Sequence, residues 1–298
     1  MIEGILVEGL IYSLMVLGVY ITFRFLDFPD LTVDGSFPLG AAVTAFLLVN
    51  GFNPFAGILL SFFAGCLAGS FTALLHNKLK IPSLLAGILT MTMLYSINIR
   101  ILGNRANVSL LKTKNLFAII SEIFNPIFSN DLTILIFLFL FVIVIKICLD
   151  VFFSTDLGLS LRALGNNERF IIQLSINPQL LKIIGVAISN GLVSLSGCLV
   201  AQYQGFSDVG MGQGIIISGL ASVMIGEFLI FSKKNIFLVT LSAILGSLLY
   251  KAIMYFGRFY GYYINMTPND LKLITGLLII FSIIIAKSRK KIRREEKW

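Results

Sequence analysis

The feature that most constrains this chain is a series of apolar runs, each long enough to cross a lipid bilayer. A membrane-crossing helix needs about 20 predominantly apolar residues. The long runs lie at about 4–26, 54–76, 82–102, 131–150, 182–203, 235–257 and 270–286. Two shorter or glycine-rich apolar runs, at 36–50 and 215–231, bring the expected number of crossings to about nine. The sequence therefore predicts an all-α polytopic membrane protein of about 8–10 transmembrane helices, including glycine-rich half-helices, in one domain over 1–286.

The amino-acid composition supports this fold class. Hydrophobic residues make up 57% of the 298 residues, above the roughly 45–50% of soluble domains. Charged residues make up 13%, about half the usual share. A soluble chain could not bury so much apolar surface, so the composition excludes a disordered chain, a secreted disulfide scaffold and a nucleic-acid-binding protein. The expected surroundings are a lipid bilayer.

Basic residues orient the predicted spans, because Lys and Arg accumulate in cytoplasmic loops. The tail at 287–298 carries much of the net charge of +8 and is expected in the cytoplasm. Nine crossings would place the other basic loops on the same side and the N-terminus outside. If the segment 27–40 enters the membrane and returns to the same side without crossing, the N-terminus would instead lie inside. The sequence leaves this choice open. The cytoplasmic loops are marked by Lys78 and Lys80, by Arg162, Arg169 and Lys182, and by Lys233 and Lys234.

A weak internal repeat links the two short apolar runs. Asp34 and Gly40 are six residues apart, as are Asp208 and Gly214, and each pair opens a short run. An odd number of crossings separates the two copies, which predicts inverted halves at about 1–150 and 178–286, a pattern typical of transporters. Small residues at four-residue spacing predict close helix packing, either within the chain or across a dimer. They are Gly65 with Gly69, and Gly210 with Gly214.

The most polar stretch lies in the loop 151–177, between the two predicted halves. Asn166 or Asn167 is placed to cap a short helix, and Asn177-Pro178 would end the loop and start the next span. Phe170, Ile171 and Leu174 would share one face of that helix, with Arg169 and Gln173 on another. The pattern predicts a short amphipathic helix at the cytoplasmic surface. Such a helix either anchors the loop in the interface or docks a cytoplasmic subunit.

Three motifs in this order give the chain a family resemblance. The loop motif Arg162-Ala163-x-Gly165-x-Asn167-x5-Gln173-x2-Ile176-Asn177 resembles the cytoplasmic loop of bacterial ABC importer permeases of the branched-chain amino acid and ribose type. The run from Asp30 to Ala41 and the run from Gly219 to Glu227 resemble the signatures of that family's two halves. The motif Leu-Thr-Val-Asp-Gly-Ser-Phe at 31–37 is similar to the corresponding motif of a subgroup thought to import tryptophan or tyrosine.

The resemblance implies a transport subunit that moves a small polar solute inward, with an amino acid, an aromatic one included, as the expected cargo. It implies an ATPase dimer, a second copy of the permease and an extracytoplasmic solute-binding protein as partners. The residues expected to couple the permease to the ATPase are Arg162, Ala163, Gly165, Asn166, Asn167, Glu168, Arg169 and Gln173.

The chain has no loop for ATP phosphates, since no Gly-Lys pair occurs in it. ATP and Mg²⁺ are therefore expected on the partner, and no cofactor or metal on this chain. No Ser-His, Cys-His or His-Glu set points to catalysis, so we expect no enzymatic activity.

Charged and polar residues in the spans are the candidates for a translocation pathway. They are Asp34, Gln202, Tyr203, Asp208 and Glu227. Asp34 and Asp208 would either cap half-helices or contact substrate, and Glu227 would pair with Lys233 or Lys234. Lys146 and Lys251 are expected to extend toward the membrane surface. The alternative function is an ion-coupled secondary transporter, for which Glu8 and Glu227 would be the coupling acids.

Overall fold

The computed structural model describes residues 2–124, 130–230 and 235–261, together with the single positions 273, 276, 277 and 280. The shorter elements are α2 (Val33–Val49), β1 (Asn107–Ser109), α5 (Leu116–Phe124), α7 (Asp156–Asn166), α8 (Glu168–Gln173) and β2 (Phe206–Asp208). The longer segments are α1 (Ile2–Tyr20) with the π-helical turn η1 (Ile21–Phe25), α3 (Pro54–Leu79), α4 (Ser83–Ile101), α6 (Asn130–Ser154), α9 (Pro178–Gln204), the 3-10 turn η2 (Val209–Gly212) with α10 (Ile215–Leu229), and α11 (Ile236–Gly261).

In this described part of the chain, seven segments are long and apolar enough to cross a membrane. They confirm the long spans predicted at about 4–26, 54–76, 82–102, 131–150, 182–203 and 235–257. The helices α2 and α10 confirm the two shorter apolar runs. The all-α fold class is confirmed apart from one short antiparallel ribbon of β1 and β2. The predicted span 270–286 and the basic tail 287–298 lie outside the described ranges. The division into two halves stays a prediction.

Local capping explains where several long helices begin and end. The Asn53 side chain accepts a hydrogen bond from the Phe55 amide, and Asn177 accepts one from the Gln179 amide at 2.9 Å. In both helices a proline follows the cap, where its missing N–H has no helical partner to lose. Gly205 ends α9 with a positive φ of 75°, a conformation that glycine adopts without strain.

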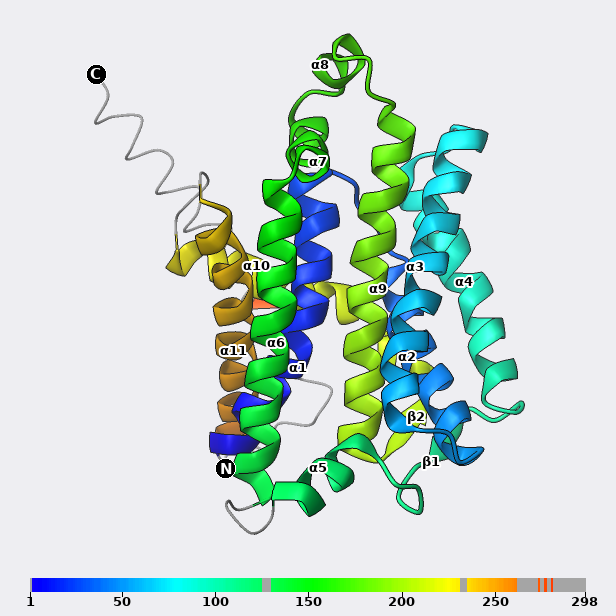
Figure 1. Cartoon of the computed structure of the whole chain (residues 1–298), viewed down its shortest axis with the longest axis vertical. Coiled ribbons are helices and arrows are strands. Elements are labelled where there is room, and N and C mark those ends of the chain that lie inside the picture. Colours follow the sequence, from blue (N-terminus) through cyan, green and yellow to red (C-terminus); the bar gives the residue numbers. More distant parts are fainter. Residues whose placement is uncertain are drawn as a thin grey trace.

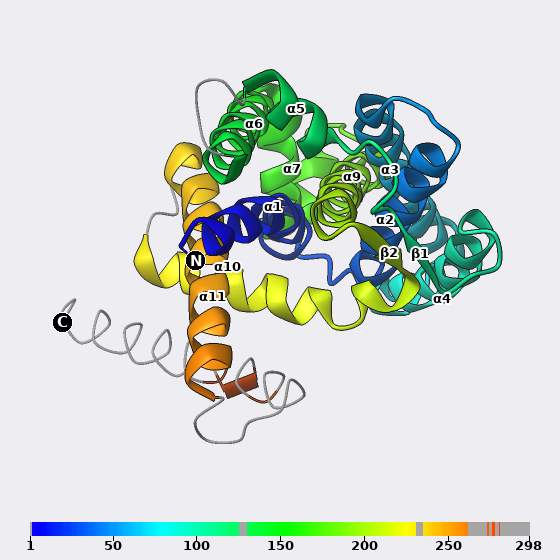
Figure 2. The ribbon, with the colours of Figure 1, turned by 90° about the horizontal axis from the view of Figure 1, so that it is seen from below.

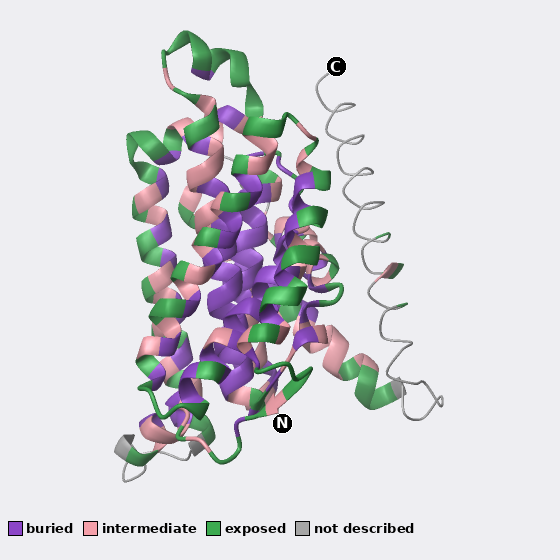
Figure 3. Cartoon of the chain, turned by 90° about the vertical axis from the view of Figure 1, so that its right-hand side faces the viewer, coloured by how far each residue is buried: buried purple, intermediate pink, exposed green. Residues whose placement is uncertain are grey.

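Two helices, α1 and α9, form the centre of the bundle. In the most apolar stretch of each, 78% of the residues are buried, against 28% in α4 and in α6. Figure 2 shows α1 and α9 in the middle, with α2, α3 and α4 to one side and α10 and α11 to the other. Figure 3 shows the same contrast as a buried core inside partly exposed outer helices. The outer helices therefore carry the apolar surface that faces lipid or another subunit.

Glycines allow the central helices to approach backbone to backbone. A Cβ on Gly65 would lie 2.3 Å from the Asn190 carbonyl oxygen, and one on Gly69 would lie 2.3 Å from that of Val186. The predicted small-residue pair of α3 thus packs within the chain, against α9. The prediction was wrong for Gly210 and Gly214, because they lie in η2 and at a left-handed turn rather than on one helix face.

The two short helices α2 and α10 meet at their N-termini. α2 begins beside the middle of α9, where the Ser36 hydroxyl donates to Asn190. The Asp34 carboxylate accepts hydrogen bonds from the Gly214 amide at 3.0 Å and the Ile216 amide at 2.9 Å. A residue of the first short helix therefore caps the second. The inverted repeat itself stays a prediction.

The ends of the molecule are distinct (Figure 1). At one end α7 and α8 protrude, and the Asn77 side chain at the end of α3 donates to the Gln179 carbonyl at the start of α9. At the other end lie the N-terminus, α5 and the β1–β2 ribbon. The end of α2 packs there, because Leu48 shares a cluster with Leu110 and Val209. The segment from η1 through α2 therefore runs from the α7 end of the bundle to the opposite end, and the side of the membrane on which the N-terminus lies stays a prediction.

Candidate functional site

α7 is fastened to the end of α1 through its inward-facing residues. The Arg162 guanidinium lies 5.4 Å from the centre of the Phe25 ring. A Cβ on Gly165 would lie 2.1 Å from the Phe25 carbonyl oxygen, so only glycine fits this crossing. Ala163 is half-buried beside them. Arg162 and Gly165 thus link α7 to η1 within the chain, and a displacement of α7 would act directly on α1.

The other five predicted coupling residues are exposed at the protruding tip. They are Asn166, Asn167, Glu168, Arg169 and Gln173. As the sequence predicted, Asn167 caps α8, accepting a hydrogen bond from the Phe170 amide at 3.3 Å. Glu168 forms an ion pair with Lys182 of α9 at 2.9 Å, which ties the tip back to the bundle.

The apolar face predicted for α8 differs from the observed one. Ile171 is fully buried, whereas Phe170, Ile172 and Leu174 are 47%, 56% and 53% exposed. The helix is only six residues long, so it buries one side chain while its neighbours stay exposed. Figure 3 shows the protruding tip mostly as exposed ribbon. Three large apolar side chains at the outermost point of the molecule form a candidate docking surface.

The candidate pathway acids of the two short runs act as caps. Asp34 caps α10, as described above. The Asp208 carboxylate accepts hydrogen bonds from the Gly210 amide at 2.6 Å and from the Asn107 side chain at 3.2 Å. It therefore closes the turn η2 and joins it to the β1–β2 ribbon. A direct contact of either acid with substrate stays a prediction.

Of the remaining pathway candidates, Gln202 and Tyr203 both contact the start of α5, whereas Glu227 lies on α10. Gln202 is buried, and its side-chain oxygen accepts a hydrogen bond from the Leu116 amide at 2.9 Å, which fixes the start of α5. Tyr203 packs edge-on against Phe117, with 5.9 Å between the ring centres. Glu227 pairs with Arg24 of η1. The expected partners of Glu227 at 231–234 lie outside the described residues, and the observed partner is 203 positions away.

A groove between α1, α10 and α11 brings together charges that the sequence analysis treated separately. Its volume is about 520 Å³, within the roughly 300–1,000 Å³ typical of small-molecule sites. Glu8 of α1 and Lys251 of α11 form an ion pair of 3.2 Å on its wall. The Lys251 ammonium also lies 3.3 Å from the centre of the Tyr12 ring. The prediction that Lys251 extends to the membrane surface was wrong, because Lys251 turns into this groove.

The comparisons agree with the family resemblance. A family model described as "Branched-chain amino acid transport system / permease component" matches residues 1–283. The tyrosine transport system permease protein of Clostridioides difficile (strain R20291) is 43% identical over 279 residues, 94% of this chain and 89% of that protein. The chain belongs to this family of ABC importer permeases.

Two further relatives span different shares of the permease. An uncharacterized protein of Rickettsia prowazekii (strain Madrid E) is 35% identical over 280 residues, 94% of the permease and 95% of that protein. The autoinducer 2 import system permease protein LsrC of Yersinia pestis (strain Pestoides F) is 25% identical over 226 residues, 74% of the permease and 59% of that protein. No solved structure matches the permease significantly.

Sequence reasoning missed a buried polar centre at the start of α2. The Asp30 carboxylate accepts hydrogen bonds from the Thr32 amide at 2.9 Å and from the Asn190 side chain at 2.7 Å. The Thr32 and Thr72 hydroxyls lie 2.8 Å apart. The position of Asp30 inside a family motif was the available signal, but the residues of this polar centre come from three separate segments of the chain, the start of α2, α3 and α9.

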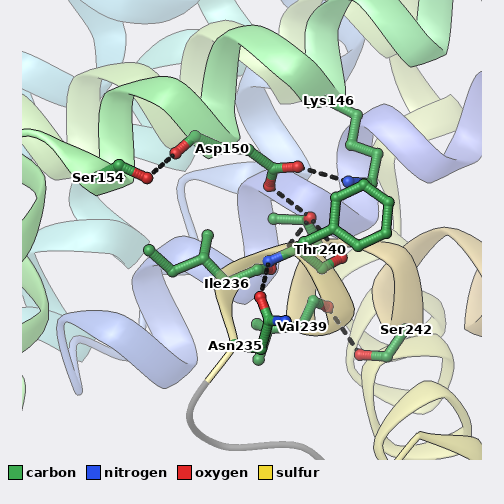
Figure 4. A network of polar contacts seen from close by, with 9 residues as sticks. Lys146, Asp150, Ser154, Asn235, Ile236, Val239, Thr240 and Ser242 are labelled. Atoms are coloured by element: carbon green, nitrogen blue, oxygen red, sulfur yellow. Dashed lines mark hydrogen bonds and ion pairs between the residues drawn. The ribbon is translucent and has the colours of Figure 1, made fainter.

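The permease also contains a buried ion pair that the sequence analysis placed wrongly (Figure 4). Lys146 of α6 is 4% exposed and pairs with Asp150, one turn further along. Thr240 of α11 donates to the other Asp150 oxygen at 2.6 Å, and the Lys146 ammonium lies 3.5 Å from the centre of the Phe237 ring. Lys146 does not extend to the membrane surface, because it is held between α6 and α11. The four-residue spacing to Asp150 was the signal in the sequence.

Proposed function

We propose that this permease is the membrane-spanning subunit of an ATP-driven importer that carries an aromatic amino acid such as tyrosine across the bacterial cytoplasmic membrane. The proposal on cargo is supported by the 43% identical relative, which is named as a tyrosine transport system permease protein and whose alignment covers 94% of this chain. It is supported further by the motif at 31–37, which lies at the centre of the bundle between α4 and α9.

The observation that carries the ATP-driven mechanism is the protruding tip of α8. Its exposed apolar residues Phe170, Ile172 and Leu174 stand among charged neighbours, a combination suited to a complementary protein surface. The chain has no phosphate-binding Gly-Lys pair, so ATP and Mg²⁺ belong to the partner. An ATPase dimer that docks on two such tips would move α7, and through Gly165 and Arg162 it would move the end of α1.

The opposite end offers the surface for a solute-binding protein. The β1–β2 ribbon joins two connections that are distant in sequence, and Gln202 holds α5 beside it. We therefore propose that the permease is oriented with the N-terminus and residues 103–115 outside the cell and with α7 and α8 in the cytoplasm. This orientation agrees with the basic residues Lys78, Lys80 and Lys182 at the α7–α8 end. The C-terminal tail is proposed to be cytoplasmic on the same rule.

We propose that a second copy of the permease covers the side formed by α10 and α11. The most apolar stretch of each segment is 44% buried within one chain, and the groove between α1, α10 and α11 opens on this side. In Figure 2 α11 lies at one side of the bundle, and α10 runs from there past α1 toward α2. A pathway between two copies would then run beside α1, α10 and α11.

The test is gentle detergent purification of the tagged permease from its native membrane, with identification of the co-eluting proteins. We expect a stoichiometric ATPase with the unaltered chain, and its loss when Phe170 and Ile172 are both changed to Asp. The matched control is Leu111→Asp, because Leu111 is 82% exposed at the opposite end and should keep the ATPase.

Two outcomes would contradict the proposal. A pure permease without any ATPase would favour the ion-coupled secondary transporter, with Glu8 and Glu227 as the acids to test next. An ATPase that stays bound to the Phe170→Asp and Ile172→Asp double variant would show that α8 is not its docking site.

A further inference from the structure

The groove between α1, α10 and α11 contains an ion pair that the rest of the chain does not enclose. The Glu8 side chain is 44% exposed and that of Lys251 is 17% exposed, although their charged atoms are 3.2 Å apart. Charged side chains in membrane helices usually face a water-filled cavity, and they mark the paths of substrates and ions. The Glu8–Lys251 pair therefore has the accessibility of a binding site as well as opposite charges.

One face of α11 adds aromatic, thioether and cationic groups to this groove. Lys251, Met254, Tyr255 and Arg258 all line it, at the spacing of residues that share a helix face. Arg258 lies two turns beyond Lys251, about 10 Å along the axis. On the facing helix, Tyr12 stands one turn after Glu8 and lies beneath the Lys251 ammonium. The groove thus offers one acidic side chain, two basic side chains and three phenol rings, those of Tyr12, Tyr250 and Tyr255.

The groove lies toward the end of the molecule that holds the N-terminus and the β1–β2 ribbon. Glu8 is in the second turn of α1, and the N-terminus lies at that end in Figure 1. Met211 of η2, which directly follows β2, forms part of the groove wall. A solute released at the β1–β2 end would therefore meet this groove early in its passage.

We propose that this groove binds the charged head of a zwitterionic aromatic amino acid, and this proposal rests on the function proposed above. The α-ammonium lies against Glu8, the α-carboxylate lies against Lys251 with Arg258 as a second cation, and the ring packs on Tyr12 and Tyr255. A zwitterion exchanges one ion pair for two, so no charge is left without a partner. An amine or an acid alone would break the Glu8–Lys251 pair and replace only one of its two charged contacts, so it would gain less than the zwitterion does.

The first test measures equilibrium binding of L-tyrosine to the permease–ATPase complex in nanodiscs, without the binding protein, whose own selectivity would obscure the result. We expect Glu8→Gln and Lys251→Gln to weaken binding about tenfold or more. Glu8→Asp and Lys251→Arg, which keep the charges, should restore most of the affinity. An unchanged affinity in both neutral variants would overturn the proposal.

Competition by two tyrosine analogues separates a contact role from a structural one. Tyramine lacks the carboxylate, and 3-(4-hydroxyphenyl)propionate lacks the ammonium. Both should compete poorly with tyrosine in the unaltered complex. Lys251→Gln should gain relative tolerance for tyramine, and Glu8→Gln should gain it for the propionate. A uniform loss of affinity with unchanged selectivity would contradict direct contact with the two charged groups.

Cysteine labelling tests whether another molecule fills the groove in the assembled complex. Ser218 lines the groove, and Ser218→Cys would be labelled by a water-soluble methanethiosulfonate after Cys66 and Cys148 are replaced by serine. We expect labelling that L-tyrosine slows and tyramine does not. A thiol that stays unreactive would assign the groove to lipid or to the second copy, and labelling that tyrosine does not slow would equally overturn the proposal.

These experiments distinguish the failure of this inference from failure of the proposed function. If the ATPase co-purifies but binding and labelling are insensitive to tyrosine and to both variants, the importer assignment stands and the groove assignment falls. If no ATPase co-purifies while tyrosine still binds through Glu8 and Lys251, the groove assignment stands and the ATP-driven mechanism falls.

Discussion

Two lysine–carboxylate pairs lie in the apolar helices of this permease, and they differ in what surrounds them. Each lysine lies over an aromatic ring, Lys146 at 3.5 Å from the centre of Phe237 and Lys251 at 3.3 Å from that of Tyr12. The side chains of Lys146 and Asp150 are 5% and 17% exposed, whereas those of Lys251 and Glu8 are 17% and 44% exposed. The same residue types thus occupy a closed and an open environment.

The difference separates a structural ion pair from one that is available to a ligand. Both Asp150 oxygens have partners in the chain, Lys146 and Thr240, and together they join α6 to α11. Asp150 also borders a shallow depression of about 470 Å³, but its two hydrogen bonds leave the carboxylate little freedom to exchange partners. Glu8 keeps nearly half of its side chain accessible and faces a groove. Charge within a membrane helix therefore identifies a functional residue only when the accessibility of that charge is also known.

The largest expected effect comes from breaking the closed pair. Lys146→Met leaves the partly buried Asp150 carboxylate without its cation, which should lower the free energy of unfolding by about 3 kcal/mol, the lower end of the range for buried pairs. Chemical unfolding in mixed micelles would measure this loss. Replacing both partners, with Lys146→Met and Asp150→Leu, should recover most of it, since apolar groups of similar volume replace closed pairs well. A single variant as stable as the unaltered chain would show that the pair is not a structural link.

A smaller effect should follow from removing the hydrogen bond that joins the closed pair to α11. Thr240→Val keeps the shape of the side chain but removes the donor to Asp150, and this should cost about 1.5–3 kcal/mol. The matched control is Ser242→Ala, because the Ser242 hydroxyl donates only to Val239 of its own helix in the described structure. Equal losses in the two variants, measured by the same unfolding titration, would remove Thr240 from the network.

The open pair should contribute little to stability. Lys251→Met leaves Glu8 in contact with water, so the free energy of unfolding should fall by only about 0–1 kcal/mol. Tyrosine binding should nevertheless decline strongly. Stability and binding measured on one preparation would show this separation, and a stability loss as large as that of Lys146→Met would erase the distinction between the two pairs.

The smallest effect is the response to salt. Raising the ionic strength from about 0.1 M to about 1 M shortens the screening length from about 10 Å to about 3 Å. The coupling energy of Glu8 with Lys251, from a double-mutant cycle, should start at about 0.2–1 kcal/mol and fall toward zero. The coupling of Lys146 with Asp150 should change less, because water and ions reach it less. The same salt response in both cycles would contradict the comparison.

The helices were predictable because hydropathy is a local property. A window of about 20 residues is enough to show whether a segment belongs in lipid, and caps such as Asn53-Pro54 and Asn177-Pro178 mark boundaries within a few residues. The cap of α8 by Asn167 was predictable for the same reason. The apolar face of α8 was not predictable from the sequence, because the rotation of a six-residue helix depends on what it packs against. In the structure only the Ile171 side chain of this helix is buried.

The partners of charged residues were the least predictable part of the site. Glu227 has two lysines a few residues away in sequence, yet it pairs with Arg24, 203 positions distant. Glu8 and Lys251 are separated by 243 positions. The rotation and crossing of whole helices decide such contacts, and here glycines decide how close the helices come.

Segment hydropathy and motif order were enough to predict that the chain crosses a membrane many times, where most of those crossings lie and to which family it belongs. Each of these depends on the character of short segments or on motifs in a given order. The fold was needed to see that Asp34 caps α10 instead of its own helix and that Gly165 packs α7 against η1. It was also needed to see that Lys251 faces a groove while Lys146 is enclosed. The reason is physical, because the energy of a charge in a membrane protein depends on the few groups that surround it, and folding brings those groups from distant segments.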